Sequence, residues 1–205
     1  MNYLAHAYLS FGIPEIVVGN LVSDFIKGKK KLDYPEAIQK GISLHRAIDT
    51  FTDTHPVTKK AKIFFREDYG LYAGALTDVV YDHFLANDTR EFPSAAQLAG
   101  FAQSIYTQVG TREKILPERF ARAFPYMRSQ DWLYNYRFKE GIFNAFAGLA
   151  RRAAYMPPPE KACMLFEAHY NELGACYNDF FPSLKDFARI TLTQLSGNGE
   201  KGKIE

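Results

Sequence analysis

The sequence predicts an all-α protein, a single-domain helical bundle. Apolar residues recur at the three- and four-residue spacing of amphipathic helices along most of the chain. No stretch keeps the two-residue alternation of an exposed β-strand over more than a few positions. Prolines stand where several helical stretches begin, the helix position that tolerates proline best. With 205 residues and neither an internal repeat nor a long linker, the chain has the length of one domain, expected over residues 1–195.

The predicted helices follow one another with short connections. Pro14 fits the first turn of the second helix, and residues 34–36 begin a long helix that ends before Pro56. Residues 28–31 are expected to form a basic loop, and Leu71 is expected in the core. An aromatic-rich turn is expected at residues 132–136. The helices are predicted over residues 2–9, 14–26, 35–55, 58–66, 70–87, 95–109, 118–127, 138–155, 159–177 and 184–195.

The composition favours a folded chain. Hydrophobic residues make up 47% and aromatic residues 15% of the sequence, which is typical of globular proteins and not of disordered ones. The net charge of +2 gives no overall attraction to nucleic acid, so no nucleic-acid partner is expected. Residues 196–205 are Gly-rich and charged, and we expect a disordered tail there. Cys163 and Cys176 are expected as reduced core thiols rather than a disulfide.

Neither a secretory signal nor a membrane span is predicted. The first residues lack a basic segment and a small-residue cleavage site. The longest apolar run, residues 11–26, is interrupted by Pro14, Glu15, Asn20 and Asp24, which makes it too polar to cross a bilayer. We therefore expect a soluble, cytoplasmic protein without a membrane partner.

Three predicted helices each present a polar pair one turn apart on an otherwise apolar face. Buried carboxylates are costly without a compensating cation, and imidazole with carboxylate is a ligand set for Mn, Fe, Zn or Mg. Ligand pairs converging from several helices are an established way to build such a site inside a bundle. The sequence therefore predicts a metal site from these pairs, with His6 and His83 close by: Asn20 and Asp24, His45 and Asp49, and Asp78 and Asp82.

Each residue also has a structural interpretation. Asp49 can pair with the neighbouring Arg46, and Asp53 can terminate its helix or cap the next one. His6 can be a hydrogen-bonded core histidine, and Asn20 can be a buried amide that ties two helices together. The metal hypothesis rests on the set as a whole.

Two basic runs stand next to these helices. A run of lysines is usually a solvated surface, but two runs on either side of the predicted metal favour an acidic or phosphorylated partner. Arg46 and Lys27 stand closest to the site and are the candidates to contact a phosphate. The partner-binding candidates are Lys27, Lys29, Lys30, Lys31, Lys59, Lys60, Lys62 and Arg66.

Five segments resemble the acyl carrier protein phosphodiesterase family. They read NYLAH at residues 2–6, GNLVSDF at 19–25, GISLHRAID at 41–49, FTDTHP at 51–56 and DVVYDHFL at 78–85. Their order and spacing match from residue 1 to about residue 192. Within this range, residues 132–133 and 180–184 also resemble the family. Five segments in register are far more specific than any single HxxxD motif.

The resemblance implies an all-helical, HD-domain-like fold and a divalent metal, typically Mn²⁺, with Mg²⁺ and Fe²⁺ as alternatives. It implies hydrolysis of the phosphodiester between 4′-phosphopantetheine and a serine of holo-acyl carrier protein, a small and very acidic partner. The usual order of HD ligands is not reproduced, since the only such neighbours are reversed as Asp82 and His83. The implied metal ligands form a pool: His6, Asp24, His45, Asp49, Asp78 and Asp82. As catalytic residues we expect Asp78 or Asp82, which would orient the attacking water, and His83 or Arg46, which would assist the leaving group or the phosphate charge.

Two other functions stay open at this point. One is an HD-like phosphohydrolase that acts on nucleotides or other small phosphodiesters. The other is a non-catalytic helical module that binds an acidic protein, with its buried acids neutralised by Arg and Lys. The sequence makes no prediction of the oligomeric state.

Overall fold

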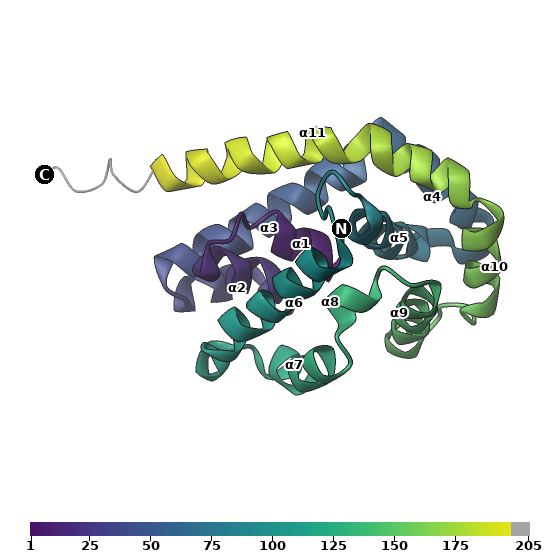
Figure 1. The fold of residues 1–205 in the computed structure, drawn as a ribbon. Helices are drawn as coiled ribbons and strands as arrows, with labels where there is room; N and C mark the ends of the chain where they lie inside the picture. Colours follow the sequence, from purple (N-terminus) through teal and green to yellow (C-terminus); the bar gives the residue numbers. More distant parts are fainter. Residues whose placement is uncertain (198–205) are drawn as a thin grey trace, which may run out of the picture.

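The computed structural model describes residues 1–197 as a bundle of helices joined by short turns, and this part contains no strand (Figure 1). The predicted all-α fold is confirmed. None of the helices in the described part combines the length and the hydropathy that crossing a bilayer requires. The α-helices are α1 Tyr3–Tyr8, α2 Pro14–Val22, α3 Glu36–Thr54, α4 Pro56–Tyr69, α5 Ala73–Asn87, α6 Ala95–Gly110, α7 Glu118–Ser129, α8 Trp132–Asn135, α9 Lys139–Arg152, α10 Glu160–Ala168 and α11 Tyr170–Gly197; the 3₁₀ turns are η1 Ser23–Phe25, η2 Gly28–Asp33, η3 Gly70–Tyr72 and η4 Glu113–Ile115.

Helices α2 and α3 form the closest contact of the bundle because a glycine from each lies at their crossing. A Cβ atom on Gly19 would lie 2.2 Å from the Ile38 carbonyl oxygen, and one on Gly41 would lie 2.5 Å from that of Ile16. Contacts this short do not occur between real side chains and backbone, so both positions require glycine. The crossing brings the backbone of α2 within hydrogen-bonding distance of side chains on α3.

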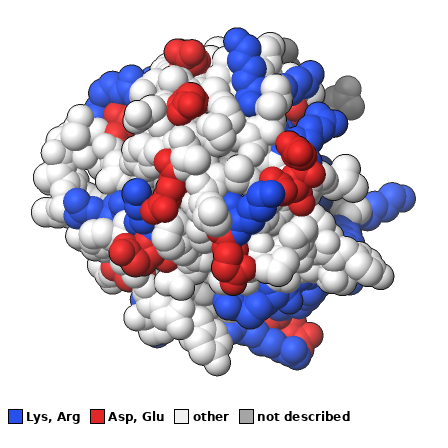
Figure 2. All heavy atoms as spheres, turned by 90° about the vertical axis from the view of Figure 1, so that its right-hand side faces the viewer, with Lys and Arg blue, Asp and Glu red and all other residues white. Residues whose placement is uncertain are grey.

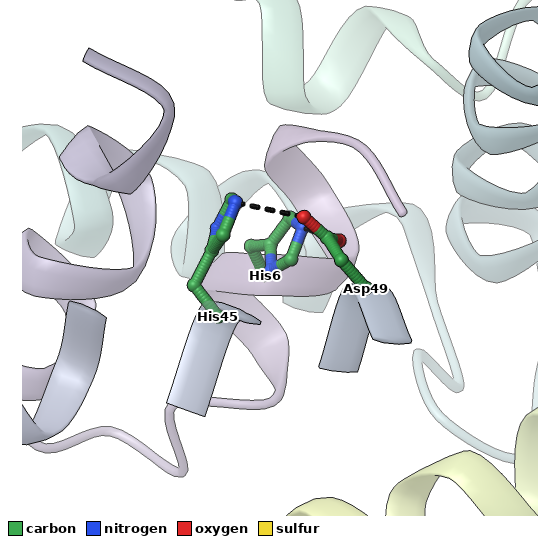
Figure 3. Close-up of side chains that lie close together, drawn as sticks. All are labelled: His6, His45 and Asp49. Carbon is green, nitrogen blue, oxygen red and sulfur yellow. Dashed lines mark ion pairs between the residues drawn. The ribbon is translucent and has the colours of Figure 1, made fainter. Parts of the chain in front are cut away.

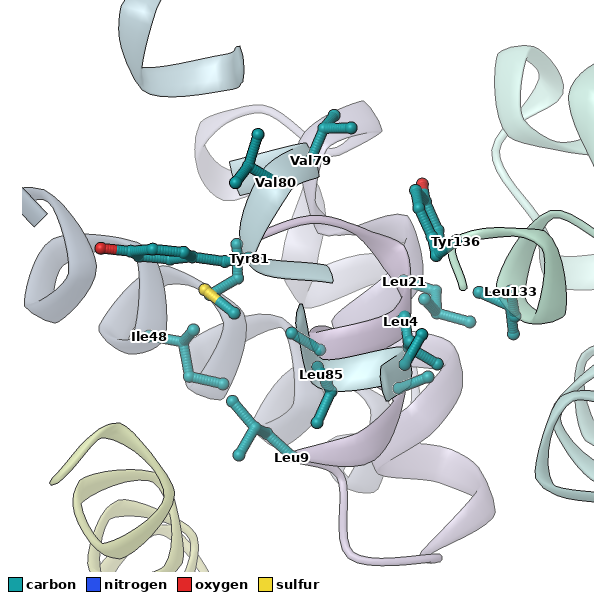
Figure 4. Packing of buried hydrophobic residues seen from close by; sticks show 14 of the residues in the cluster. Leu4, Leu9, Leu21, Ile48, Val79, Val80, Tyr81, Leu85, Leu133 and Tyr136 are labelled. Atoms are coloured by element: carbon teal, nitrogen blue, oxygen red, sulfur yellow. The ribbon is translucent and has the colours of Figure 1, made fainter. Parts of the chain in front are cut away.

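A shared apolar core joins α1, α3 and α5. Leu4 and Leu9 from the first segment, Ile48 from α3, and Tyr81 and Leu85 from α5 have no exposed surface and point into one cluster (Figure 4). Burying side chains of this size stabilises the fold by about 1.5–3 kcal/mol each. The same helices carry the polar pairs, so this core fixes the relative positions of the site residues.

The last two helices of the structure, α10 and α11, have other bounds than the two helices predicted for this part of the chain. The prediction places one helix over residues 159–177 and another over 184–195, but the chain turns at His169 and α11 then continues past Pro182. An internal proline costs about 3 kcal/mol. The buried side chains of Phe180, Phe181 and Leu184 around it pack against the core and offset that cost. Helix α11 lies along α3, α4 and α5 (Figure 1).

Other boundaries differ by a few residues. The predicted loop at residues 28–31 is the 3₁₀ turn η2, and the second helix ends at Val22 and continues as η1. Leu71, expected in the core, is fully exposed because Gly70 turns the chain with a φ of 50° before α5 begins. Of the expected tail, Ser196 and Gly197 belong to α11, and residues 198–205 lie outside the described part. Cys163 and Cys176 are half-buried and unpaired.

Candidate metal centre

Three side chains from two helices meet at the centre of the bundle. His6 comes from α1, while His45 and Asp49 lie one turn apart on α3 (Figure 3). His6 Nε2 lies 3.1 Å from Asp49 Oδ1, and His45 Nε2 lies 3.0 Å from Asp49 Oδ2. The two imidazole rings stack, with centroids 3.9 Å apart. Each of the three offers a ligand atom within 4.8 Å of the others, a separation that one metal ion can bridge.

Asn20 on α2 determines which nitrogen of each histidine faces Asp49. Its amide nitrogen donates to the His6 carbonyl and to Ser10 Oγ, so its side-chain oxygen accepts from His6 Nδ1 at 2.8 Å. Its backbone carbonyl accepts from His45 Nδ1 at 2.7 Å. A nitrogen that donates a hydrogen bond carries the proton, so in the neutral form of each ring Nε2 keeps its lone pair. One asparagine thus orients two candidate ligands, as partners behind metal-bound histidines usually do.

The two histidines have opposite protonation states in the absence of a metal. Burial lowers the pKa of His6 to about 4, and the neighbouring His45 lowers it further. Burial also acts to lower the pKa of His45, but the hydrogen bonds that its ring donates to Asp24 and Asp49 outweigh it and raise that pKa to about 9. Burial acts to raise the pKa of Asp49. The two imidazoles outweigh this effect and lower that pKa far below its usual range. His6 is therefore neutral at pH 7 and His45 is protonated.

This donor set fits a divalent cation. Neutral His6 directs the lone pair of Nε2 at two acceptor oxygens, those of Asp49 and of the Met1 carbonyl, both 3.1 Å away. Such an arrangement is unfavourable unless a cation lies between these atoms. On His45, Nε2 carries a proton instead of a lone pair. This nitrogen lies 3.0 Å from Asp49 Oδ2 and 2.9 Å from Asp24 Oδ1, so both carboxylates share the proton. The group of His6, His45 and Asp49 is thus able to hold a metal ion.

Two further acids border the cluster. Asp24 on η1 is largely exposed and contacts His45 Nε2 through Oδ1, and this hydrogen bond lowers the pKa of Asp24. Asp78 on α5 and Asp49 both contact the α-amino group of Met1. Its nitrogen is 3.1 Å from Asp78 Oδ1 and 3.6 Å from Asp49 Oδ1. Burial raises the pKa of Asp78, and the Met1 ammonium opposes that rise. The ammonium group partly balances the negative charge that these carboxylates bring together.

The structure places Asp82 and His83 in other contacts. Asp82 is fully buried and accepts hydrogen bonds from the backbone N–H groups of Asn2, Leu4 and Ala5, where α1 begins. Burial raises its pKa to about 7. His83 donates from Nδ1 to the Tyr136 carbonyl, and its Nε2 contacts the Tyr170 hydroxyl. Both residues thus connect elements of the bundle, and their expected catalytic roles stay predictions.

Comparisons with known proteins identify the family of this chain. The acyl carrier protein phosphodiesterase family matches residues 1–184. The chain belongs to this family. The acyl carrier protein phosphodiesterase of Serratia proteamaculans (strain 568) is 31% identical over 92% of this chain and 98% of its own. That of Yersinia pestis is 32% identical over 90% of this chain and 95% of its own. No solved structure matches the chain, so its likeness to HD domains stays a prediction.

In this member of the phosphodiesterase family, the two basic runs lie at opposite ends of α3. Lys27, Lys29, Lys30 and Lys31 belong to η2 and the residue before it, whereas the other run lies on α4. A 19-residue helix is about 28 Å long. The group of His6, His45 and Asp49, called the metal cluster below, therefore lies between the two runs rather than beside both. The Arg46 side chain is exposed and donates to the Ile26 carbonyl at 3.0 Å.

One lysine of the basic run on α4 is paired with a carboxylate, and the other basic residues of that run are exposed. Lys62 pairs with Asp53 at 2.7 Å, while Lys59, Lys60 and Arg66 are exposed. On the face shown in Figure 2, Lys and Arg side chains alternate with Asp and Glu, without one sign of charge covering it. Asp53 continues the helical spacing of His45 and Asp49, but its carboxylate pairs with Lys62. It is therefore not part of the cluster formed by His6, His45 and Asp49.

Sequence reasoning did not assign Asn20 its role behind the histidines. Its spacing with Asp24 drew attention to it, but only the crossing of α2 over α3 shows that it contacts both rings. Arg151 and Arg152 were not singled out at all, although they line a cavity next to the site. Basic residues in the last turn of a helix are too common to stand out in a sequence.

Proposed function

We propose that this protein hydrolyses the phosphodiester between 4′-phosphopantetheine and the serine of holo-acyl carrier protein. The products are apo-acyl carrier protein and free 4′-phosphopantetheine. The observation that carries the proposal is the joint position of His6, His45 and Asp49, in a chain that matches proteins named for this activity over nearly their whole length.

The metal ligands we propose are His6 Nε2, His45 Nε2 and the Asp49 carboxylate, with Asp24 as a fourth. Mixed nitrogen and oxygen donors suit Mn²⁺, and Mg²⁺ or Fe²⁺ are the alternatives. A bound divalent cation supplies positive charge to a phosphate oxygen and lowers the pKa of a bound water. Asn20 keeps both Nε2 atoms available by holding the proton of each neutral ring on Nδ1.

The chain's own residues carry the remaining steps. Asp78, whose pKa is raised by burial, accepts a proton from the attacking water. The water oxygen bonds to phosphorus, the bond from phosphorus to the serine Oγ breaks, and Oγ leaves with the electron pair. Oγ takes up a proton from the solvent, to which Asp78 returns the proton that it accepted. Arg46 is exposed beside η1 and faces the negative charge of the phosphate. Asp82 and His83 act only through the positions of α1 and α5.

The basic residues fit an acidic protein substrate. Lys27, Lys29 and Lys30 are exposed on or next to η2, directly after η1, which carries Asp24. A carrier protein docked there approaches the metal cluster from the exposed side of Asp24. The run on α4 is the second contact that we propose, at the far end of α3.

Mass spectrometry of holo-acyl carrier protein tests the proposal. Incubation with the enzyme and Mn²⁺ is expected to convert holo-carrier to apo-carrier and to release 4′-phosphopantetheine. His45→Ala and Asp49→Ala should each reduce the rate by at least 1,000-fold, since each removes a proposed ligand. Asp53→Ala is the matched control on the same helix and should keep the wild-type rate.

Full activity of both ligand variants would remove the metal cluster from the mechanism. If the protein instead cleaves nucleotides or bis(4-nitrophenyl) phosphate and leaves holo-carrier intact, the substrate assignment is wrong while the metal centre stands. Elemental analysis of the purified protein separates either enzyme from a non-catalytic module, because only the enzymes require about one bound metal per chain.

A further inference from the structure

A second site opens beside the metal cluster. A cavity of about 580 Å³ lies between the N-terminal segment, α8 and α9. Asn2 and Tyr3 form one wall, Trp132 and Asn135 form the second, and Arg151 and Arg152 form part of the third. The volume is that of a site for a small molecule.

Small residues on α9 keep this cavity open. Gly141, Ala145 and Gly148 recur at helical spacing on the face of α9 that lines it. Gly141 is needed because a Cβ atom there would lie 1.9 Å from the Asn135 carbonyl oxygen, where α8 approaches α9. At Gly148 a Cβ atom would meet only Arg151, at 3.8 Å from Nη2, so nothing in the packing of the bundle requires glycine there.

The third wall carries positive charge. Arg151 and Arg152 are both exposed, and neither pairs with a carboxylate within residues 1–197. Arginine binds phosphate with two parallel hydrogen bonds, so unpaired guanidinium groups at a cavity favour an anionic ligand. Basic residues in the last turn also interact with the helix dipole. That interaction predicts an effect on stability only, and not on ligand binding.

Amide groups line the same cavity. Asn135 donates from Nδ2 to the Gln130 carbonyl, but its side-chain oxygen has no donor within the described chain. The Asn144 amide likewise makes no hydrogen bond within residues 1–197. The Trp132 ring, which lies 6.3 Å from the Tyr3 ring between centroids, adds an apolar surface beside them. This mixture suits a slender chain with amide and aliphatic segments.

The cavity borders the segment that leads to His6: Asn2 and Tyr3 line it, and the carbonyl of the preceding Met1 lies 3.1 Å from His6 Nε2. Tyr3 stands in the first turn of α1, the helix that carries His6. Burial raises the pKa of Tyr3; the Arg152 guanidinium opposes that rise and Asp24 adds to it. Asp24 in turn lies 2.9 Å from His45 Nε2. A phosphate placed beside Tyr3 can therefore face the cluster on one side and Arg152 on the other, with the rest of the ligand in the cavity.

We infer that the cavity between α1, α8 and α9 holds the prosthetic-group side of the diester, with Arg151 and Arg152 on its phosphate and the amides of Asn135 and Asn144 on its peptide-like arm. The inference rests on the proposed function. It assigns the two partners of the scissile bond to opposite sides of the cluster, with the pantetheine arm towards α9 and the carrier protein towards η2.

Calorimetric titration of the Mn²⁺-loaded protein with the product, 4′-phosphopantetheine, tests this inference without turnover. Arg151→Gln combined with Arg152→Gln should weaken binding about 10- to 100-fold, the effect of losing charge-assisted hydrogen bonds. Gly148→Leu places a side chain in the cavity and should weaken binding of pantetheine, which lacks the phosphate, by a similar factor. Metal content of each variant is expected to equal that of the wild type.

Two variants serve as matched controls. Gly100→Leu adds the same side chain to α6 at a position with no atom within 4 Å, and Arg119→Gln removes an arginine from a different surface cavity, beside η2. Both should bind 4′-phosphopantetheine as the wild type does. Unchanged binding in the Arg151/Arg152 and Gly148 variants would overturn the inference, and loss of binding in Arg119→Gln would move the arm to the η2 side. Release of apo-carrier by the wild type in either case shows that the proposed function survives.

Discussion

At the residue scale, Asn20 on α2 contacts both candidate imidazole ligands, His6 and His45. Its side-chain oxygen and its backbone carbonyl each hold the Nδ1 proton of a different histidine, at 2.8 and 2.7 Å. Because the same residue orients both rings, the two Nε2 lone pairs converge on Asp49. The geometry of the donor set therefore depends on a residue that is itself no ligand.

Asn20→Leu is expected to lower the affinity for Mn²⁺ about 10- to 100-fold, as loss of a partner behind metal-bound histidines usually does. Titration of the metal-free protein with Mn²⁺ measures this effect. Ser10→Ala is the control, because Ser10 Oγ accepts from Asn20 Nδ2 without contacting either ring. Equal affinities of wild type and Asn20→Leu would show that packing alone orients the histidines.

The raised pKa of His45 makes the stability of the metal-free protein depend on pH. Its pKa of about 9 in the folded state lies above the unfolded value of 6.5, so its contribution is complete below pH 6.5 and disappears as the pH rises through 9. Chemical unfolding of the wild type and of His45→Gln in the presence of a chelator should show their difference in unfolding free energy falling by roughly 3 kcal/mol over this window.

Comparing the two proteins at each pH removes contributions that they share. His6 and His83 have lowered pKa values and change stability mainly below pH 6.5, in the opposite direction. The Met1 α-amino group has a raised pKa and acts in the same direction as His45 above pH 8. A difference that stays constant from pH 6.5 to 9 would mean that His45 is neutral in the metal-free protein.

At the element scale, the crossing of α2 over α3 sets the site. Gly19 and Gly41 let the two backbones approach so closely that their Cα atoms exclude any side chain between them. The hydrogen bond from His45 Nδ1 to the Asn20 carbonyl spans this same crossing. The packing of two helices and the orientation of a candidate ligand are therefore one structural feature.

Gly41→Ala is expected to destabilise the protein by about 2–3 kcal/mol, because the helices must separate to admit a Cβ atom 2.5 Å from the Ile16 carbonyl oxygen. Mn²⁺ affinity should fall with it, since the Asn20 carbonyl moves away from His45. Gly100→Ala is the control: it meets nothing within 4 Å and should stabilise α6 by about 0.5–1 kcal/mol. Denaturant unfolding measures both, and equal stability of Gly41→Ala and wild type would contradict the close crossing.

At the scale of the whole molecule, positive charge lies at both ends of α3. The net charge is only +2, so attraction of an acidic partner depends on where the lysines gather. The run on η2 adjoins η1 and Asp24, whereas the run on α4 lies beyond the other end of the helix and commits Lys62 to Asp53. Steering towards the metal cluster is therefore expected mainly from η2.

Charge reversal tests this expectation on the affinity for holo-acyl carrier protein. Lys29→Glu, Lys30→Glu and Lys31→Glu together should weaken binding at least 10-fold at low salt, and the loss should shrink as salt screens the charges. Lys59→Glu with Lys60→Glu is the comparison and should have a smaller effect. Unchanged affinity of the η2 variant at low salt would place the docking surface elsewhere.

The sequence by itself determined the helical class, most helix positions and the pool of polar residues from which the cluster is built. Helical periodicity and proline positions are local signals, and polar pairs one turn apart share a face in any helix. His6, His45 and Asp49 were all in that pool. Pro182 misled the prediction because the cost of an internal proline is local, whereas the burial of Phe180 and Leu184 that offsets it is not.

Only the tertiary structure decided which members of the pool meet. Asp82 has the same spacing and the same apolar surroundings as Asp49, yet it accepts from the backbone that begins α1. The close approach at Gly19 and Gly41, and the cavity beside Arg151 and Arg152, likewise depend on how helices cross. Spacing along one helix fixes the face on which a side chain lies. The partner on that face is chosen by the packing of segments far apart in the chain, and no local pattern encodes it.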